Sequence, residues 1–475
     1  MEKNNLVFKG VLWSAVDRFA AVGLQLLFEI FLARLLLPSD YGLIGMVAVF
    51  LAIAQVFVDG GFMNALIQKQ NRTELDFSTV FYTSLILSLL LYMLLFFSAP
   101  KIALFYKVPQ LIGIVRILGL NIIINSIALV YRAKLSISMD FKIQAKLSVF
   151  SVILSGIIGV FLAYHGYGVW ALVTQSISVY TFNALFLFFN LRWLPLLRFS
   201  KESFNKLFGF GSKLLVAGLI QNIYSNLYSV LIGKVFSMRE LGLYSKSSQF
   251  TLYPSTMFTG MLQRVLYPYL SQYQNDNEKL FDLNKQYYTM IAMFFFPLFF
   301  GLGVLAEPFV KILLSDTWIE AVPLIRVLAI AFLFFPFINV NMFIFQIKGM
   351  SARFLLIEVL TKITGVIILL ITLKYGVLIM CYGLLVQHII QLFITSYYSD
   401  KALNSSKFSQ LKVLLPMFVV SIFIAAIVIM SIHNIKTSIF QLLIGIFLFI
   451  FLYSVYYYLF MKKMLISFVN ILIKS

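Results

Sequence analysis

The chain has 475 residues, of which 61% are apolar and 12% are charged, and its formal net charge is +19. Soluble globular proteins contain about 45–50% apolar and about 25% charged residues, so this composition excludes a soluble fold. A helix that spans a bilayer needs roughly 20 apolar residues, and the chain length therefore allows about fourteen spans with short connections. The single cysteine, Cys381, excludes an internal disulfide framework and a cysteine-rich metal site.

Apolar runs of spanning length follow one another along the whole chain. Each run is predicted to be a helix, because open sheet edges are not tolerated in hydrocarbon. The predicted fold class is therefore all-α, a polytopic membrane protein of about fourteen transmembrane helices. The predicted helices cover residues 10–36, 41–66, 77–99, 110–135, 143–164, 167–190, 205–235, 243–268, 286–313, 322–347, 352–373, 376–398, 411–432 and 438–460.

The basic residues are unevenly distributed between the two sides of the predicted topology. With the N-terminus inside, 25 of the 37 lysines and arginines lie in segments assigned to the cytoplasm, among them Arg132 and Lys134. Cytoplasmic connections of membrane proteins carry such an excess, so both termini are predicted to be cytoplasmic. The topology thus accounts for most of the positive charge, and no nucleic-acid partner is implied.

The sequence repeats itself at an offset of about 200 residues. Residues 34–43 read RLLLPSDYGL and residues 234–243 read KVFSMRELGL, so basic, acidic, glycine and leucine positions coincide. Arg116 and Arg326 are a later equivalent pair, and both are expected to snorkel to the membrane interface. Six helices per repeat predict two lobes of the same orientation, related by a pseudo-two-fold axis along the membrane normal. The predicted parts are residues 1–198, residues 199–402 and two additional helices in residues 403–475.

Polar side chains lie in register inside the predicted helices of both lobes. In the first helix, Arg18, Gln25 and Glu29 fall on one face because separations of 4, 7 and 11 residues return to nearly the same direction. At the offset of 200, Glu29 corresponds to Ser229 in helix 205–235. We expect these two faces to line a space between the lobes. The predicted substrate-binding residues are Arg18, Gln25, Glu29, Lys213, Asn222, Ser225, Asn226, Ser229 and Lys246, and the predicted ion-coupling residues are Asp59 and Asp17.

Each charged candidate also has a structural alternative. Arg18 could form an ion pair with Asp17 or Glu29 that holds the first helix against a neighbour. Asp59 precedes two glycines, which indicate a kink or a close helix contact. Lys213 is either a residue of the positive inner side or a contact to phosphate.

The sequence carries no motif for enzyme chemistry. It has no glycine-rich phosphate loop that ends in lysine and serine or threonine, which disfavours an ATP-driven pump. Its histidines, cysteine and carboxylates have no metal-ligand spacing, so neither a metal nor another cofactor is predicted. The predicted external loops are short, which disfavours a membrane enzyme of glycan assembly.

Three stretches of the sequence resemble a known family. Residues 32–84, LARLLLPSDYGLIGMVAVFLAIAQVFVDGGFMNALIQKQNRTELDFSTVFYTS, are similar to the N-terminal signature of the bacterial polysaccharide-transport family, and residues 132–142 and 166–173 match a second part of it. That family contains the O-antigen, colanic-acid and teichuronic-acid flippases. It belongs to the multidrug, oligosaccharidyl-lipid and polysaccharide exporter superfamily.

The resemblance implies a V-shaped bundle of two lobes in the bacterial cytoplasmic membrane. It implies translocation of an undecaprenyl-pyrophosphate-linked oligosaccharide to the periplasmic leaflet by alternating access, for O-antigen, capsule or exopolysaccharide synthesis. Arg18 would then bind the pyrophosphate, and a polysaccharide polymerase or glycosyltransferases would be partners of a monomeric protein. In lipid II flippases of the superfamily, two extra C-terminal helices help to form a groove for the isoprenoid tail. The last two helices here would do the same or would pack against ordinary lipid.

A second function within the same superfamily is a cation-coupled multidrug exporter. Asp59 or Glu29 would then be the ion site. Arg18 disfavours this alternative, because its charge would repel cationic drugs.

Overall fold

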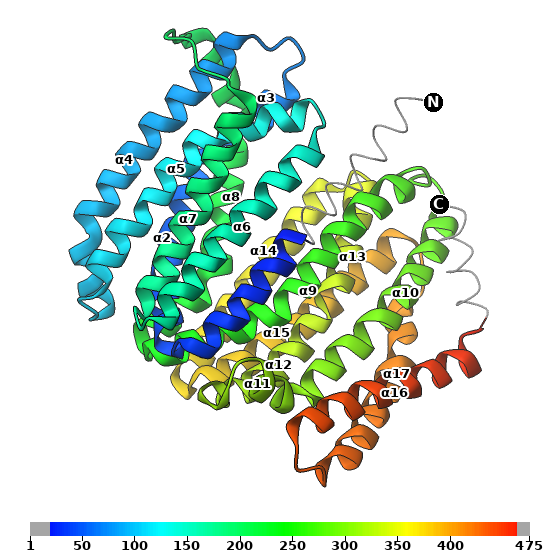
Figure 1. The fold of residues 1–475 in the computed structure, drawn as a ribbon. Coiled ribbons are helices and arrows are strands. Elements are labelled where there is room, and N and C mark those ends of the chain that lie inside the picture. Colours follow the sequence, from blue (N-terminus) through cyan, green and yellow to red (C-terminus); the bar gives the residue numbers. More distant parts are fainter. Residues whose placement is uncertain (1–19, 463–475) are drawn as a thin grey trace. The chain divides into compact units, whose positions relative to one another are not determined.

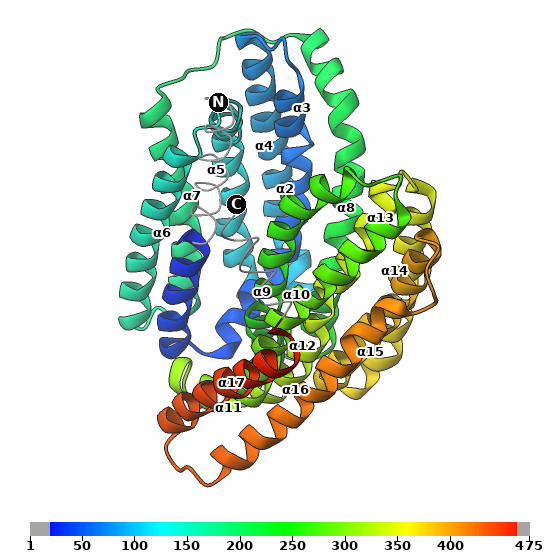
Figure 2. The same ribbon diagram turned by 90° about the vertical axis from the view of Figure 1, so that its right-hand side faces the viewer.

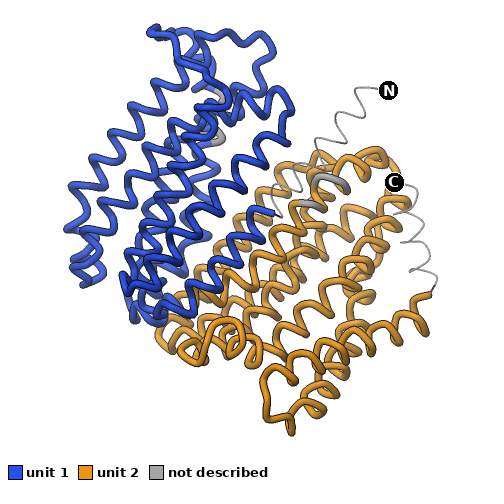
Figure 3. The backbone as a smooth tube through the Cα atoms, in the orientation of Figure 1, with its two compact units in different colours: residues 1–242 blue, residues 243–475 orange. Residues whose placement is uncertain are grey.

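The structure is a computed structural model that describes residues 20–462, apart from the side chains of Phe210, Lys213, Leu214, Met261, Arg264 and Val265. The chain forms two compact units, residues 1–242 and residues 243–475 (Figure 3). Throughout the described part, the regular structure is helical. The predicted lobe boundaries at residues 198 and 402 concern the internal repeat, and they remain predictions.

Unit 1 consists of long helices joined by short connections (Figure 1). Neighbours in sequence are also neighbours in space: α4 packs along α5, and α6 packs along α7 (Figure 2). Helix α8 contacts α2, α3 and α4, and it therefore belongs to this unit. The helices are the first helix, described over residues 20–35, α2 (Pro38–Asp59), α3 (Phe62–Gln68), α4 (Glu74–Tyr106), α5 (Leu111–Ile137), α6 (Phe141–Tyr164), α7 (Val169–Leu191), α8 (Lys201–Val235) and the start of α9 (Met238–Ser271).

Unit 2 begins within the first turns of α9 and contains the remaining helices. Helix α10 packs against α12 and α16, α12 packs against α15, and α17 packs against α11 and α16. The helices are α10 (Asn277–Val304), α11 (Ala306–Leu313), α12 (Ala321–Leu333), α13 (Phe335–Ile347), α14 (Ser351–Thr372), α15 (Val377–Ala402), α16 (Ser409–His433) and α17 (Ser438–Phe460), with short 3-10 turns at Asp316–Trp318 and Leu373–Tyr375.

Twelve spans among the described residues are long and apolar enough to cross a membrane. The all-α membrane fold predicted from composition is therefore confirmed, while the total of fourteen spans stays a prediction. Three predicted runs are divided: 41–66 into α2 and α3, 286–313 into α10 and α11, and 322–347 into α12 and α13. Helix α9 is not one of the twelve spans, because lysine, serine and threonine side chains recur along it.

The break between α2 and α3 lies at Gly60 and Gly61. Both glycines have left-handed backbone conformations, with φ of 44° and 70°, which residues with a Cβ atom rarely adopt. A Cβ atom on Gly61 would lie 2.7 Å from the Cα atom of Gly211 in α8. The kink and the close helix contact that the sequence offered as alternatives after Asp59 are both present.

A second close crossing joins the N-terminal turns of α2 and α9 inside unit 1. A Cβ atom on Gly42 would overlap the carbonyl oxygen of Met238, and a Cβ atom on Gly242 would overlap the carbonyl oxygen of Pro38. Gly42 and Gly242 are equivalent at the offset of 200, as are Pro38 and Met238. The two copies of this repeated segment, residues 34–43 and 234–243, therefore contact each other reciprocally.

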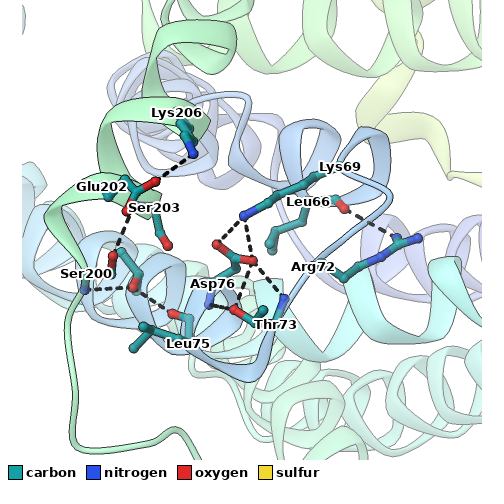
Figure 4. Close-up of polar contacts among 11 residues, drawn as sticks. Leu66, Lys69, Arg72, Thr73, Leu75, Asp76, Ser200, Glu202, Ser203 and Lys206 are labelled. Atoms are coloured by element: carbon teal, nitrogen blue, oxygen red, sulfur yellow. Dashed lines mark hydrogen bonds and ion pairs between the residues drawn. The ribbon is translucent and has the colours of Figure 1, made fainter.

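The connection from α7 to α8 is held against the first turns of α4. The backbone N–H of Leu196 donates to Ser78 Oγ at 2.8 Å, and the N–H of Ser200 donates to Thr79 Oγ1 at 3.2 Å. Beside them, the Asp76 carboxylate accepts hydrogen bonds from Lys69 Nζ at 2.7 Å and from the N–H of Thr73 at 2.7 Å (Figure 4). The Asp76 side chain is fully buried, so this cluster joins the end of α3 to the start of α4.

We expect Asp76→Asn to lower the free energy of unfolding by about 1–3 kcal/mol, because the amide cannot accept all the hydrogen bonds of the carboxylate and leaves Lys69 without its charge partner. Glu202→Gln is the matched control, since the Glu202–Lys206 pair is on the surface beside it (Figure 4). The melting temperature of the purified protein checks both variants. Equal melting temperatures for the two variants would contradict the role given to Asp76.

Candidate functional site

A polar cavity of about 420 Å³ lies inside unit 1, among the first helix, α2, α5, α6 and α7. Most of the residues that line it carry a hydroxyl or an amide group, and one guanidinium and one carboxylate accompany them. The polar lining residues are Gln25, Glu29, Tyr41, Arg132, Ser148, Ser151, Ser155, Gln175, Ser176, Tyr180 and Asn183.

The spacing of these residues along α6 and α7 explains why their side chains meet. Ser148, Ser151 and Ser155 are three and four residues apart, so they form one stripe on α6. The hydroxyls of Ser151 and Ser155 donate to carbonyl oxygens of their own helix, at 2.7 Å and 3.1 Å, which satisfies them inside the membrane-spanning segment. Their oxygen lone pairs remain able to accept hydrogen bonds from a ligand.

Arg132 is the cation among the described residues that line this cavity. Its guanidinium donates to the carbonyl oxygen of Asn125 at 3.2 Å and also to Asn125 Oδ1. Asn125 lies seven residues earlier in α5, about 10 Å along the axis, so the side chain points toward the middle of the helix as helical side chains do. From the sequence, Arg132 is predicted to lie in a cytoplasmic segment, and it is not among the predicted site residues.

A second cavity, of about 400 Å³, lies on another side of Arg132. Asp59, Asn64 and Asn125 line it together with Arg132 and several apolar side chains from α2, α3, α5 and α8. Asp59 accepts a hydrogen bond from Gln55 Nε2 at 2.9 Å, and it interacts electrostatically with Arg132. Arg132 therefore forms part of the wall of both cavities.

The charges around the two cavities do not sum to a cationic site. Among the described residues that line them, one guanidinium, from Arg132, is accompanied by two carboxylates, from Glu29 and Asp59. A guanidinium offers a planar set of donors, and carboxylates and amides offer acceptors. Such a lining suits a neutral ligand with many hydroxyl groups better than it suits a multiply charged anion.

The structure brings three of the sequence-predicted residues into these cavities. Gln25 and Glu29 line the first cavity, and Asp59 lines the second. Arg18 and Asp17 lie outside the described residues. Lys213 is in α8, and its side chain is also outside the described set.

The other predicted residues lie elsewhere. The side chains of Asn222, Ser225 and Asn226 donate to carbonyl oxygens of α8 itself, at 3.1, 3.1 and 2.9 Å, and with Ser229 they line neither cavity. Lys246 is in unit 2, where its side chain is buried and donates to Gln249 Oε1 at 3.0 Å. The predicted facing of the two polar stripes across the lobes stays a prediction.

Comparison with known proteins identifies the family. Residues 31–323, more than half of the chain, match the family described as polysaccharide biosynthesis protein. The chain belongs to this family. It is 26% identical to the teichuronic acid biosynthesis protein TuaB of Bacillus subtilis (strain 168), over 72% of this chain and 71% of that protein. It is also 26% identical to the succinoglycan biosynthesis transport protein ExoT of Rhizobium meliloti (strain 1021), over 68% of this chain and 66% of that protein.

Solved structures share the fold. The lipid II flippase MurJ in an inward closed conformation superposes with a TM-score of 0.73 at 16% identity, covering 94% of this chain and 99% of that one. An inward-facing multidrug transporter of the MATE family gives a TM-score of 0.64 at 16% identity, covering 82% and 98%. The family match confirms the predicted family, and these structures show that the fold is shared. The protein is a multi-pass membrane protein, and its family indicates transport rather than catalysis.

Proposed function

We propose that this protein translocates a polyprenyl-pyrophosphate-linked oligosaccharide across the bacterial cytoplasmic membrane by alternating access. The glycan would serve the synthesis of O antigen, capsule or exopolysaccharide. The observation that carries the proposal is the cavity around Arg132, whose hydroxyl and amide lining lies among membrane-spanning helices. Family membership supports the same substrate class.

A glycan is the ligand that this lining fits on chemical grounds. Each sugar hydroxyl both donates and accepts a hydrogen bond, and leaving one unpaired in an apolar environment costs several kcal/mol, on the order of 2–7. The cavity offers serine, glutamine, asparagine and tyrosine side chains, which also donate and accept. Arg132 adds a fork of donors that can bind two oxygen atoms at once.

Residues other than those proposed for the glycan would bind the pyrophosphate and would couple transport to an ion. Arg18 and Lys213 stay our candidates for the pyrophosphate, because Glu29 and Asp59 offset the charge of Arg132 in unit 1. Lys246 stays a predicted substrate-binding residue. Asp59 stays our candidate for ion coupling, with Asp17 as its predicted companion. Asp59 is suited to that role because its carboxylate lines a cavity and interacts with a fixed cation.

Deletion of the gene followed by lipid extraction tests the proposal. We expect the deleted strain to accumulate a polyprenyl-linked oligosaccharide in the cytoplasmic leaflet and to lose its surface glycan. A plasmid copy of the gene should abolish the accumulation and restore the surface glycan. Unchanged surface glycan together with increased drug sensitivity would contradict the proposal and favour the second candidate.

That second candidate is a cation-coupled multidrug exporter, and the carboxylates of Glu29 and Asp59 are the observation that favours it. Anionic side chains in a membrane cavity attract cationic drugs. Arg132 lies in the wall of both cavities, and its charge opposes such a ligand.

We further propose that the protein works as a monomer with cytoplasmic termini. A polysaccharide polymerase or glycosyltransferases are the expected partners. Cross-linking in cells, followed by mass spectrometry of the captured proteins, checks the partners.

A further inference from the structure

Unit 2 contains a cavity of its own, of about 610 Å³, at the junction of α10, α11 and α12 with α16 and α17. Glu307, Arg326, His433 and Gln441 supply its polar wall, and side chains such as Phe300 and Ile330 supply the apolar part. The proposed glycan site uses none of these residues.

The Arg326 guanidinium at this cavity is not hydrogen-bonded to the nearby carboxylate of Glu307. Lys311 Nζ lies 2.9 Å from Glu307 Oε1, whereas Arg326 Nη2 lies 3.8 Å from Glu307 Oε2, beyond hydrogen-bond distance. The hydrogen bond from Lys311 holds the pKa of Glu307 below its usual range, so this carboxylate is ionised at neutral pH. Lys311 does not line the cavity and also interacts electrostatically with Asp316. The half-exposed Arg326 guanidinium therefore keeps its donors for a ligand.

An apolar groove of about 420 Å³ lies between α10, α11 and α17, three helices that also contribute to the cavity. The two spaces share the same helices: Gly303 of α10 and Gln441 of α17 line the cavity, and the near neighbours Gly301 and Leu442 line the groove. Along α17 the groove extends from Leu442 to Ile450, about 12 Å at 1.5 Å per residue.

We infer that this cavity and groove bind one anionic phospholipid, with its phosphate at Arg326 and part of an acyl chain along α17. A guanidinium fork matches two phosphate oxygens. Because Lys311 is hydrogen-bonded to Glu307, the Arg326 guanidinium is the cation that remains for one phosphodiester charge, and a pyrophosphate would exceed it. The groove is also short for a polyprenyl chain and suits the first part of an acyl chain. The last two helices would then hold ordinary lipid, and this inference does not depend on the transported substrate.

The equivalent arginine of unit 1 lacks these features. Arg116 lies over the ring of Phe96, with its Cζ atom 4.3 Å from the ring centroid, and it lines none of the cavities described above. The repeat therefore provides a matched control, with the same residue type at the corresponding position.

Native mass spectrometry of the purified full chain tests the site, with phosphatidylglycerol, phosphatidylcholine, undecaprenyl phosphate and inorganic phosphate as probes. We expect phosphatidylglycerol to bind more tightly than phosphatidylcholine. Arg326→Gln should weaken phosphatidylglycerol binding about tenfold, as expected for one lost charge-assisted hydrogen bond. It should weaken phosphatidylcholine binding less, because the choline group offsets the charge of that phosphate. Arg116→Gln should change neither affinity. Ile446→Trp, which fills the groove, should weaken both lipids without changing the charge at Arg326.

Other results would overturn the inference. Equal effects of Arg326→Gln and Arg116→Gln would show that a general cationic surface binds the lipid. If inorganic phosphate competed for the site as well as phosphatidylglycerol does, the site would bind an anion only, and the groove would hold no acyl chain. Tighter binding of undecaprenyl phosphate than of phosphatidylglycerol would assign the groove to the transported lipid.

Discussion

Arg132→Gln should reduce glycan export to about a tenth of the wild-type rate or less, with the protein still present in the membrane. The guanidinium lies in the wall of both cavities of unit 1 and is oriented by Asn125. A hydrogen bond to a charged group contributes about 1.5–3 kcal/mol, and each 1.4 kcal/mol corresponds to about a factor of ten. The measurement is surface glycan in a deletion strain that carries the variant on a plasmid.

Two further variants separate binding from charge. Arg132→Lys keeps the positive charge beside Asp59 but loses the planar fork of donors. This variant should be present in the membrane at the wild-type level, and its glycan export should lie between those of Arg132→Gln and the wild type. Arg116→Gln changes an arginine of the same helix that contacts Phe96 instead, and export should stay normal. Normal export by Arg132→Gln at a normal protein level would remove Arg132 from the proposed site.

Hydropathy predicted the helical fold because the bilayer allows few other structures, but it could not locate every interruption. The break after Asp59 has a local signal, two consecutive glycines, and both adopt left-handed conformations. The separation of α12 from α13 occurs at Phe334, within residues 327–338, none of which has a polar side chain. Pro336 is the nearest signal, and it is tolerated there as the second residue of α13.

The candidate site was predictable where helical spacing alone decides which side chains share a face. Gln25 and Glu29 are four residues apart, and they line one cavity. Arg132 could not be assigned in the same way, because a basic residue near a helix end is ordinarily assigned to the membrane surface. The only local indication of a role for Arg132 was Asn125, seven residues earlier on the same face of α5. The role of Arg132 depends on a cavity to which four other helices contribute.

The second large effect is expected at the crossing of α2 and α9. Gly42→Ala and Gly242→Ala should each lower the melting temperature strongly and reduce the amount of protein in the membrane. In both variants the new methyl group would overlap a backbone carbonyl oxygen, of Met238 or Pro38, and a backbone atom cannot move aside as a flexible side chain can. Overpacking costs about 1–3 kcal/mol where side chains can adjust, and we expect more here.

Gly260→Ala is the control, because this glycine of α9 has open space around it and alanine favours a helix by about 0.5–1 kcal/mol. It should be as stable as the wild type or more so. If Gly42→Ala or Gly242→Ala behaved like this control, the two helices would not cross at these residues.

The reciprocity of the crossing makes a sharper prediction for the double variant. Each alanine must move the same two helix ends apart, since Gly42 faces Met238 while Gly242 faces Pro38. Once the first methyl group has separated α2 from α9, the second meets less resistance. The combined loss of stability should therefore be smaller than the sum of the single losses, by about 0.5–3 kcal/mol as for other residues in contact. If the two losses of stability were additive, the two alanines would clash independently of each other. The equivalent glycines Gly42 and Gly242 would then not share one reciprocal contact between α2 and α9.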